Sequence, residues 1–215
     1  MTAVLTPTPA LVVDDLSLSF GGNHVLQQIA LRLTPGEITG LIGPNGAGKT
    51  SFFNCLTGLY SPKGGAIRFG ERRIERVAPA DRAELGFSRS FQHVALCPDL
   101  SIAEVADALP ASLPPGVLRL AEIARASVGG PRVLLLDEPA AGLNSGETRE
   151  LASALKGLRS PQLVLVVVEH DMDLIMDVCD TIHVLNVGKL LASGNPESIR
   201  ANAEVVRVYL GDDGG

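Results

Sequence analysis

The sequence lacks any long hydrophobic run, although 46% of its 215 residues are hydrophobic. The longest run, from Leu163 to Val168, fits a buried strand, whereas a membrane-spanning helix needs about 20 apolar residues. The hydrophobic content is ample for the core of a globular protein. We therefore expect any role at a membrane to be peripheral.

Cysteines are few, and runs of basic residues are absent. Cys55, Cys97 and Cys179 are odd in number and form no CxxC pair, which argues against a disulfide framework or a zinc site and favours reduced thiols in the core. The formal net charge is -6, and no run of Lys or Arg is long enough to follow a nucleic-acid backbone. The expected partners therefore include no nucleic acid.

The beginning of the chain also lacks the features of a targeting segment. It has no basic segment and is interrupted by Pro7 and Pro9, so we predict neither a signal peptide nor a transit peptide. Residues 1–10 are expected to form a disordered tail. The expected location is the cytoplasm.

One glycine-rich stretch matches the phosphate-binding pattern GxxxxGK[ST] and lies between a predicted strand over 37–42 and a predicted helix over 51–57 that Gly58 closes. In such a loop the glycines let backbone N–H groups turn toward phosphates, Lys49 supplies a positive charge, and Thr50 offers a hydroxyl to Mg²⁺. The sequence therefore predicts a nucleoside triphosphate site. Its candidate residues are Gly43, Pro44, Asn45, Gly46, Ala47, Gly48, Lys49, Thr50 and Ser51.

An antiparallel β-region is predicted before this loop. Residues 11–20 and 24–33 carry apolar residues at strand-like spacing on either side of a turn at 21–23. Phe20 lies just before the turn and could stack on a nucleotide base, although an ordinary sheet aromatic fits the spacing equally well. Residues 61–70 read as a turn and a strand that returns to this region. The charged segment 71–84 is expected to be solvated.

The second half of the chain alternates strands and helices. Continuous apolar strands at 133–136 and 163–168 flank a predicted helix over 146–158, which indicates a parallel sheet covered on both faces. Helices are also predicted over 101–108, with Ser101 as the N-cap residue, and over 117–128. The predicted fold class is α/β: a P-loop NTPase core with a mostly parallel sheet flanked by helices, plus the N-terminal antiparallel β-region.

Chemistry-bearing residues follow two of these strands. Asp137 and Glu138 end the first, at the edge where open α/β sheets place their ligands. Asp137 can hold the Mg²⁺ that Thr50 also contacts, and Glu138 can polarise a water for attack on a γ-phosphate. His170 follows the second strand and reaches the same edge. The other histidines have no such placement and are taken as structural, and Met172, Ile175, Met176 and Cys179 have the spacing of a helix core stripe.

These motifs, in this order, make the chain resemble an ATP-binding cassette (ABC) ATPase subunit, most closely the ATP-binding subunits of branched-chain amino acid importers. The resemblance covers residues 11–211 and is closest in Phe87 to Val94, Asp137 to Asn144, Val168 to Met172 and the tail from Leu191 to Gly211. It implies one ABC ATP-binding domain over 11–211, with a flexible tail over 212–215. It also implies a second ATP-binding cassette and integral membrane permease subunits as partners, and a peripheral position on the inner face of the membrane.

The resemblance also implies roles for single residues. Phe20 takes the adenine-stacking position, and Lys49 and Thr50 contact phosphate and Mg²⁺. Gln92 is the lid-loop glutamine that senses Mg²⁺ and the attacking water, next to the surface that contacts the permease. Asp137 holds the metal, Glu138 is the general base, Asn144 lies in the loop that crosses to the partner cassette, and His170 contacts the γ-phosphate.

The sequence departs from the family in two places. Where the family has Leu-Ser-Gly-Gly-Gln or Leu-Ser-Tyr-Gly-Gln, this chain has Leu113-Pro114-Pro115-Gly116-Val117, which lacks the serine hydroxyl and the glutamine amide and has no N–H at Pro115. The residues between Gln92 and Leu113 would span only about 30 Å even as one helix, so most of the helical subdomain is expected to be missing, leaving a reduced helical and signature region over 93–128.

Three functions remain open at this point. The chain could be an ATPase motor of an importer, coupling cassette dimerisation to transport. It could be a nucleotide-binding but hydrolytically impaired regulatory or structural cassette, which the altered signature favours. It could also be a shortened relative that folds poorly.

Overall fold

The computed structural model describes residues 8–90 and 114–210 of the chain. Predictions for Gln92, His93, Cys97 and the helix over 101–108 lie outside these residues. The described part already includes Thr8, upstream of the expected domain start at Leu11; its side chain is buried, and its hydroxyl donates to the carbonyl of Gln162 (2.6 Å).

An antiparallel sheet is built mainly by the first half of the chain, as predicted. It contains β1 (Leu11–Phe20), β2 (Asn23–Leu33), β4 (Gly64–Phe69) and β5 (Arg72–Arg73), in the order β2-β1-β4-β5. β4 pairs with β1 at the register Val13 to Ile67, so the segment after the phosphate loop does return to the first β-region.

The second sheet is mostly parallel. Its order is β10-β9-β3-β8-β7-β6, in which all pairs are parallel except the pair of β10 with β9. The bounds of its strands are β3 (Ile38–Ile42), β6 (Phe87–Arg89), β7 (Val133–Asp137), β8 (Val164–Val168), β9 (Thr181–Asn186) and β10 (Lys189–Gly194).

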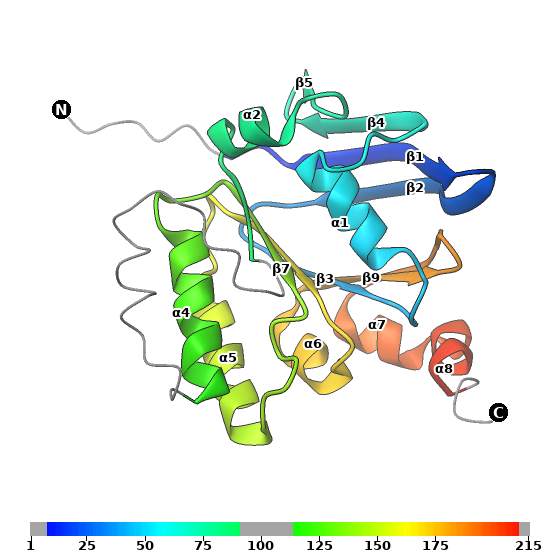
Figure 1. The fold of residues 1–215 in the computed structure, drawn as a ribbon. Coiled ribbons are helices and arrows are strands. Elements are labelled where there is room, and N and C mark those ends of the chain that lie inside the picture. The colour runs from blue at the N-terminus through cyan, green and yellow to red at the C-terminus, as the bar shows by residue number, and fades with distance from the viewer. Residues whose placement is uncertain (1–7, 91–113, 211–215) are drawn as a thin grey trace.

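Helices cover both faces of this sheet (Figure 1). α1 (Lys49–Thr57) lies on the face toward the antiparallel sheet, and α2 (Pro79–Glu84) lies beside β6. The helices of the other face are α4 (Pro115–Ser127), α5 (Ser145–Gly157), α6 (Met172–Val178), α7 (Pro196–Ala201) and α8 (Ala203–Leu210). No helix in the described ranges 8–90 and 114–210 has the length and apolar character needed to span a bilayer.

The central strands are buried throughout because each contributes to two cores. On β7, Leu135 packs into the core shared with α1 and the antiparallel sheet, whereas Leu134 and Leu136 pack under the helices of the opposite face. Side chains of a strand alternate between its faces, so a strand covered on both sides needs apolar residues at consecutive positions. This alternation explains why the continuous apolar runs predicted a doubly covered sheet.

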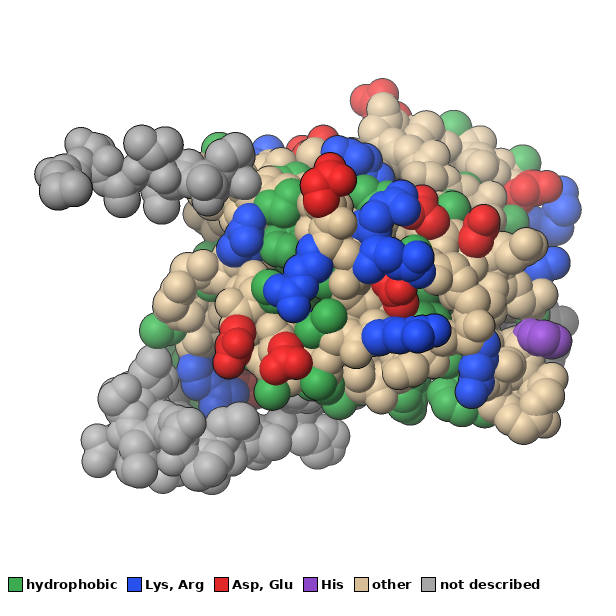
Figure 2. Space-filling view, turned by 90° about the horizontal axis from the view of Figure 1, so that it is seen from above, with side chains coloured by type: hydrophobic (Ala, Val, Ile, Leu, Met, Phe, Trp, Pro, Cys, Tyr) green, Lys and Arg blue, Asp and Glu red, His purple; other side chains and the backbone are tan. Residues whose placement is uncertain are grey.

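The prediction that the charges of segment 71–84 are solvated is wrong for Arg82. Its side chain is only 1% exposed. The guanidinium donates to the carbonyls of Cys55 and Leu56 (both 2.6 Å), of Val77 (3.0 Å) and of Ile74. The neighbouring face of the antiparallel sheet is charged at its surface, where basic and acidic side chains are interspersed (Figure 2).

Candidate functional site

The phosphate-binding loop connects β3 to α1 through a tight turn that requires glycine. Gly43 and Gly48 have positive φ angles of 151° and 105°. A Cβ atom on Gly43 would lie 2.2 Å from the carbonyl oxygen of Leu185 on β9, and one on Gly48 would lie 2.8 Å from the side chain of Leu26. The glycines of the motif therefore let the loop pass close to two neighbouring strands.

The start of α1 is suited to bind an anion. No side chain caps the helix at Gly48 within the described structure, so the first backbone N–H groups remain directed toward the loop. The Lys49 ammonium donates to the carbonyls of Gly43 (2.6 Å) and Pro44 (3.0 Å). Burial lowers the pKa of Lys49, while the nearby carboxylates of Glu138 and Asp137 raise it. A triphosphate would match both the N–H groups and this charge.

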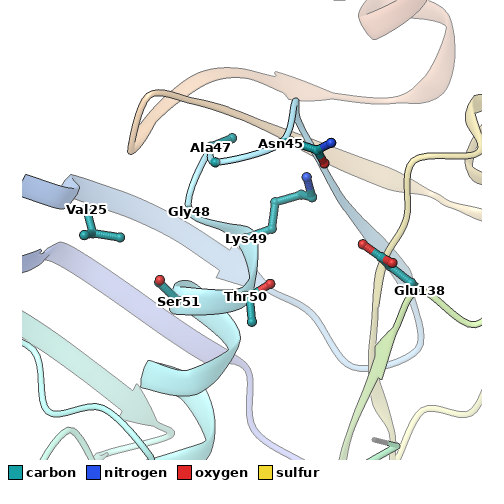
Figure 3. A pocket seen from close by; sticks show the side chains of 9 residues that line it. Val25, Asn45, Ala47, Gly48, Lys49, Thr50, Ser51 and Glu138 are labelled. Atoms are coloured by element: carbon teal, nitrogen blue, oxygen red, sulfur yellow. The ribbon is translucent and has the colours of Figure 1, made fainter. Parts of the chain in front are cut away.

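A cleft of about 270 Å³ lies over this loop. In Figure 3, Lys49 from α1 and Glu138 from the end of β7 project into it from opposite sides. The residues that line it are Val25, Asn45, Gly46, Ala47, Gly48, Lys49, Thr50, Ser51 and Glu138. Sequence reasoning missed Val25, because nothing in the pattern of β2 indicates that this strand passes beside the phosphate loop.

The two carboxylates after β7 have different surroundings. Glu138 has a positive φ of 47°, and its backbone N–H donates to the carbonyl of Val168 (2.9 Å), which fixes the turn that directs the side chain into the cleft. Asp137 is buried and forms an ion pair with Arg89 (2.6 Å). Sequence reasoning did not predict this pair.

The donors present fit Mg²⁺ bound together with a nucleotide. Mg²⁺ usually keeps several waters and takes one or two carboxylates plus phosphate oxygens, and the Thr50 hydroxyl and the Asp137 carboxylate are oxygen ligands of this kind. Within residues 8–90 and 114–210, no group of three or more His, Cys, Asp or Glu residues could hold a metal ion.

His170 follows β8 and reaches the same edge of the sheet as Glu138. Its side chain is 66% exposed, with Nδ1 3.7 Å from the Glu169 carboxylate. Glu169 itself is fully buried and accepts backbone N–H bonds from Ala140 (2.6 Å), His170 (3.0 Å) and Asp171 (3.4 Å). Burial raises the pKa of Glu169. This carboxylate joins the loop after Glu138 to the turn that carries His170, a role that the sequence analysis did not predict.

The structure does not place Phe20 among the residues that line the cleft. Phe20 ends β1, is half exposed, and makes an edge-to-face contact with Tyr60 at 5.1 Å between ring centroids. The adenine-stacking role of Phe20 therefore stays a prediction.

The backbone N–H groups at the start of α4 find their partners within this chain. Pro114 and Pro115 have no N–H, the N–H of Gly116 donates to the Glu147 carboxylate (3.0 Å), and the N–H of Val117 donates to the carbonyl of Pro114 (3.0 Å). Glu147 also accepts from the N–H of Asn144 (3.0 Å), the residue that caps α5. The altered signature is thus joined to the loop predicted to cross to a partner.

Two family models match the sequence. The model described as ABC transporter matches residues 26–109, and the model described as Branched-chain amino acid ATP-binding cassette transporter matches residues 189–215.

Curated relatives match over nearly the whole chain. The high-affinity branched-chain amino acid transport ATP-binding protein LivG of Salmonella typhimurium is 38% identical, and BraF of Pseudomonas aeruginosa, which carries the same description, is 36% identical. Both alignments run over 251 positions and cover 95% of this chain and 98% of the relative. Because 251 positions exceed the 215 residues of this chain, the relatives contain residues within the matched region that this chain lacks.

Solved structures share the fold. An ATP-binding cassette of an ABC transporter in its ADP conformation superimposes with a TM-score of 0.83 at 22% identity, covering 96% of this chain and 99% of the other. A bacterial Atm1-family ABC exporter with ATP bound gives a TM-score of 0.78 at 20% identity, covering 99% of this chain and 44% of the exporter chain.

Proposed function

The chain belongs to the ABC transporter ATPase family, and we propose that within it the chain is the ATP-binding subunit of an importer for branched-chain or related amino acids. The observation that carries the proposal is the cleft of about 270 Å³ in which the phosphate loop and Glu138 lie on opposite sides. The descriptions of LivG and BraF support the solute class. Attachment to permease subunits would place the chain at the inner face of the membrane.

The residues in and beside the cleft have distinct tasks in hydrolysis. The N–H groups at the start of α1 and the Lys49 ammonium bind the β- and γ-phosphates and stabilise the charge that develops on them. Thr50 and Asp137 would hold Mg²⁺, which supplies charge neutralisation on the phosphate oxygens when bound. Glu138 accepts the proton of the attacking water, and its backbone, fixed by Val168, holds the carboxylate toward the cleft.

His170 and Gln92 complete the proposed catalytic set. His170 contacts the γ-phosphate, and the Glu169 carboxylate positions it by accepting the N–H groups of His170 and Asp171. Gln92 orients the attacking water and senses the metal, a role carried over from the family resemblance. Phe20 stacks on the adenine.

Replacing Glu138 by Gln tests the proposed base. The variant keeps the size and hydrogen-bonding reach of the side chain but cannot accept the proton, so hydrolysis should fall by at least about 100-fold while ATP affinity is retained. Phosphate release is measured with a cassette that carries an intact signature segment added to the native chain or the variant, and equilibrium ATP binding is measured on the same preparations. Continued turnover in Glu138→Gln would exclude this residue as the base.

A second function, a hydrolytically impaired partner cassette, is favoured by the start of α4. The N–H groups of Gly116 and Val117 are already engaged within the chain, and Pro114 and Pro115 have none. This helix start therefore offers a poor phosphate site to an opposing cassette. A pair with a cassette that carries an intact signature would restore one working site, built on Lys49, Asp137 and Glu138.

The two functions differ in what the chain does alone. We expect very low ATP hydrolysis by the purified chain and an increase when a cassette with an intact Leu-Ser-Gly-Gly-Gln or Leu-Ser-Tyr-Gly-Gln segment is added. Full activity of the chain as a homodimer would refute the asymmetric arrangement. An upward shift of a cooperative unfolding transition with Mg-ATP would argue against a poorly folding relative.

A further inference from the structure

Arg89 ends β6 and reaches across to the neighbouring strand. β6 and β7 are parallel, with Arg89 paired in register with Leu135. The Arg89 guanidinium forms an ion pair with the Asp137 carboxylate at 2.6 Å, and each of the two side chains is 9% exposed. The charged groups therefore meet in a nearly dry environment, where an unpaired charge would be costly.

The guanidinium is also held from the side of α1. Its Nη1 donates to the side-chain oxygen of Asn54 (2.7 Å), and its central carbon lies 5.7 Å from the centre of the Phe53 ring. α1 is the helix that follows the phosphate loop. Arg89 thus connects that helix to the carboxylate that would hold the metal, and three elements fix its position.

From this geometry we propose that Arg89 is a positioning residue that acts as the internal counter-ion of Asp137. It orients the carboxylate and balances its charge when no metal is bound, and it competes with a divalent cation for the same carboxylate. The inference rests on the proposed function, which assigns Asp137 to Mg²⁺.

Removing Arg89 has two consequences, and both make nucleotide binding depend more strongly on Mg²⁺. Without Arg89, the Asp137 carboxylate, whose charge acts on Lys49 of the phosphate loop, has lost its counter-charge. A nucleotide without metal is then repelled by one more uncompensated negative charge, so its affinity falls. A divalent cation gains a carboxylate that is no longer paired, so the improvement that Mg²⁺ brings to nucleotide binding grows. The ratio of the dissociation constant in EDTA to that in Mg²⁺ should therefore increase, by about 10-fold, a common size for coupling between two ligands.

The test is calorimetric binding of AMP-PNP to the full chain in EDTA and in excess Mg²⁺. Arg89→Ala should raise the ratio about 10-fold over the native chain, and Arg89→Lys, which keeps the charge, should keep the ratio near the native value. Arg159→Ala is the matched control, because Arg159 pairs with Asp180 on an exposed surface. It should leave the ratio unchanged.

An unchanged ratio in Arg89→Ala would overturn the proposal, whether both affinities persist or fall together, since a purely structural role affects both conditions alike. If the alanine variant does not fold, Arg89→Gln replaces it, because glutamine keeps a polar side chain at this buried position but carries no charge. The same increase is expected, and the native ratio would again overturn the proposal. Absence of AMP-PNP binding to the native chain would instead contradict the proposed function itself.

Discussion

Replacing Arg82 by alanine should destabilise the fold by about 4 kcal/mol. Arg82 lies on α2 and is 1% exposed, and its guanidinium donates to four carbonyls. Two of them, those of Cys55 and Leu56, belong to the last turn of α1, where helix carbonyls have no partner within the helix. Burial lowers the pKa of Arg82 to about 10, so the group stays charged at neutral pH.

The size of the effect follows from what the four carbonyls retain. Those of Cys55 and Ile74 each also accept a backbone N–H, from Gly58 (3.3 Å) and Val77 (2.9 Å), whereas those of Leu56 and Val77 have no second donor in the described structure. Two buried carbonyls left without a partner cost about 1–3 kcal/mol each. The loss of packing around the side chain adds to this cost, and relief from burying a charge offsets part of it.

The assay is urea unfolding followed by far-UV circular dichroism, because the chain contains no tryptophan to report by fluorescence. In a thermal scan the same loss should lower the midpoint by roughly 8–16 °C for a domain of this size. Arg76→Ala is the control, since Arg76 lies on the same segment and is exposed. If Arg82→Ala were no more than about 1 kcal/mol less stable than Arg76→Ala, the buried hydrogen bonds would not hold α1 as described.

Three further changes test the site and the core. Lys49→Ala removes the ammonium that lies over the phosphate loop and should weaken AMP-PNP binding by at least about 10-fold in calorimetry, while the unfolding midpoint without nucleotide stays near that of the native chain. Burial raises the pKa of Glu169 above the value of about 4.3 that the group has in the unfolded chain, so the native chain loses stability as pH rises from there and Glu169 ionises. In urea unfolding, Glu169→Gln should therefore gain stability relative to the native chain from pH 4 to pH 7, whereas a constant difference would contradict this. Burial also raises the pKa of Cys55 to about 11 and of Cys179 to about 12. Iodoacetamide at pH 8 should therefore modify these two thiols only after unfolding, as detected by peptide mass mapping. Rapid labelling of either thiol in the folded chain would show that it is accessible.

Much of the architecture is local information. The apolar runs before Asp137 and Glu169 predicted strands covered on both faces, because each strand must fill two cores with alternate side chains. The turn at 21–23 predicted the antiparallel pair of β1 and β2. Once parallel strands are recognised, their carboxyl ends share an edge, so the nearness of Glu138 and His170 in the fold could also be anticipated.

The phosphate loop was predictable for the same reason. Its glycines, Lys49 and Thr50 lie within one short stretch between a strand and a helix, and the chemistry needs no partner from elsewhere in the chain to be recognised. The sequence by itself therefore determined that this protein has an α/β fold with a phosphate-binding loop, and it predicted which strand ends lie beside that loop.

Only the tertiary structure decided how the remaining polar groups are used. The sequence predicted Arg82 to be a solvated surface charge, but α2 packs so that its guanidinium binds the carbonyls at the end of α1. Arg89 pairs with Asp137, and Glu147 accepts the N–H of Gly116. The partners in each pair are too far apart in the sequence for any helix or strand periodicity to predict the contact. A buried charge is favourable only when another element supplies its partner, and that pairing depends on where two distant segments pack, which local propensity and spacing do not specify.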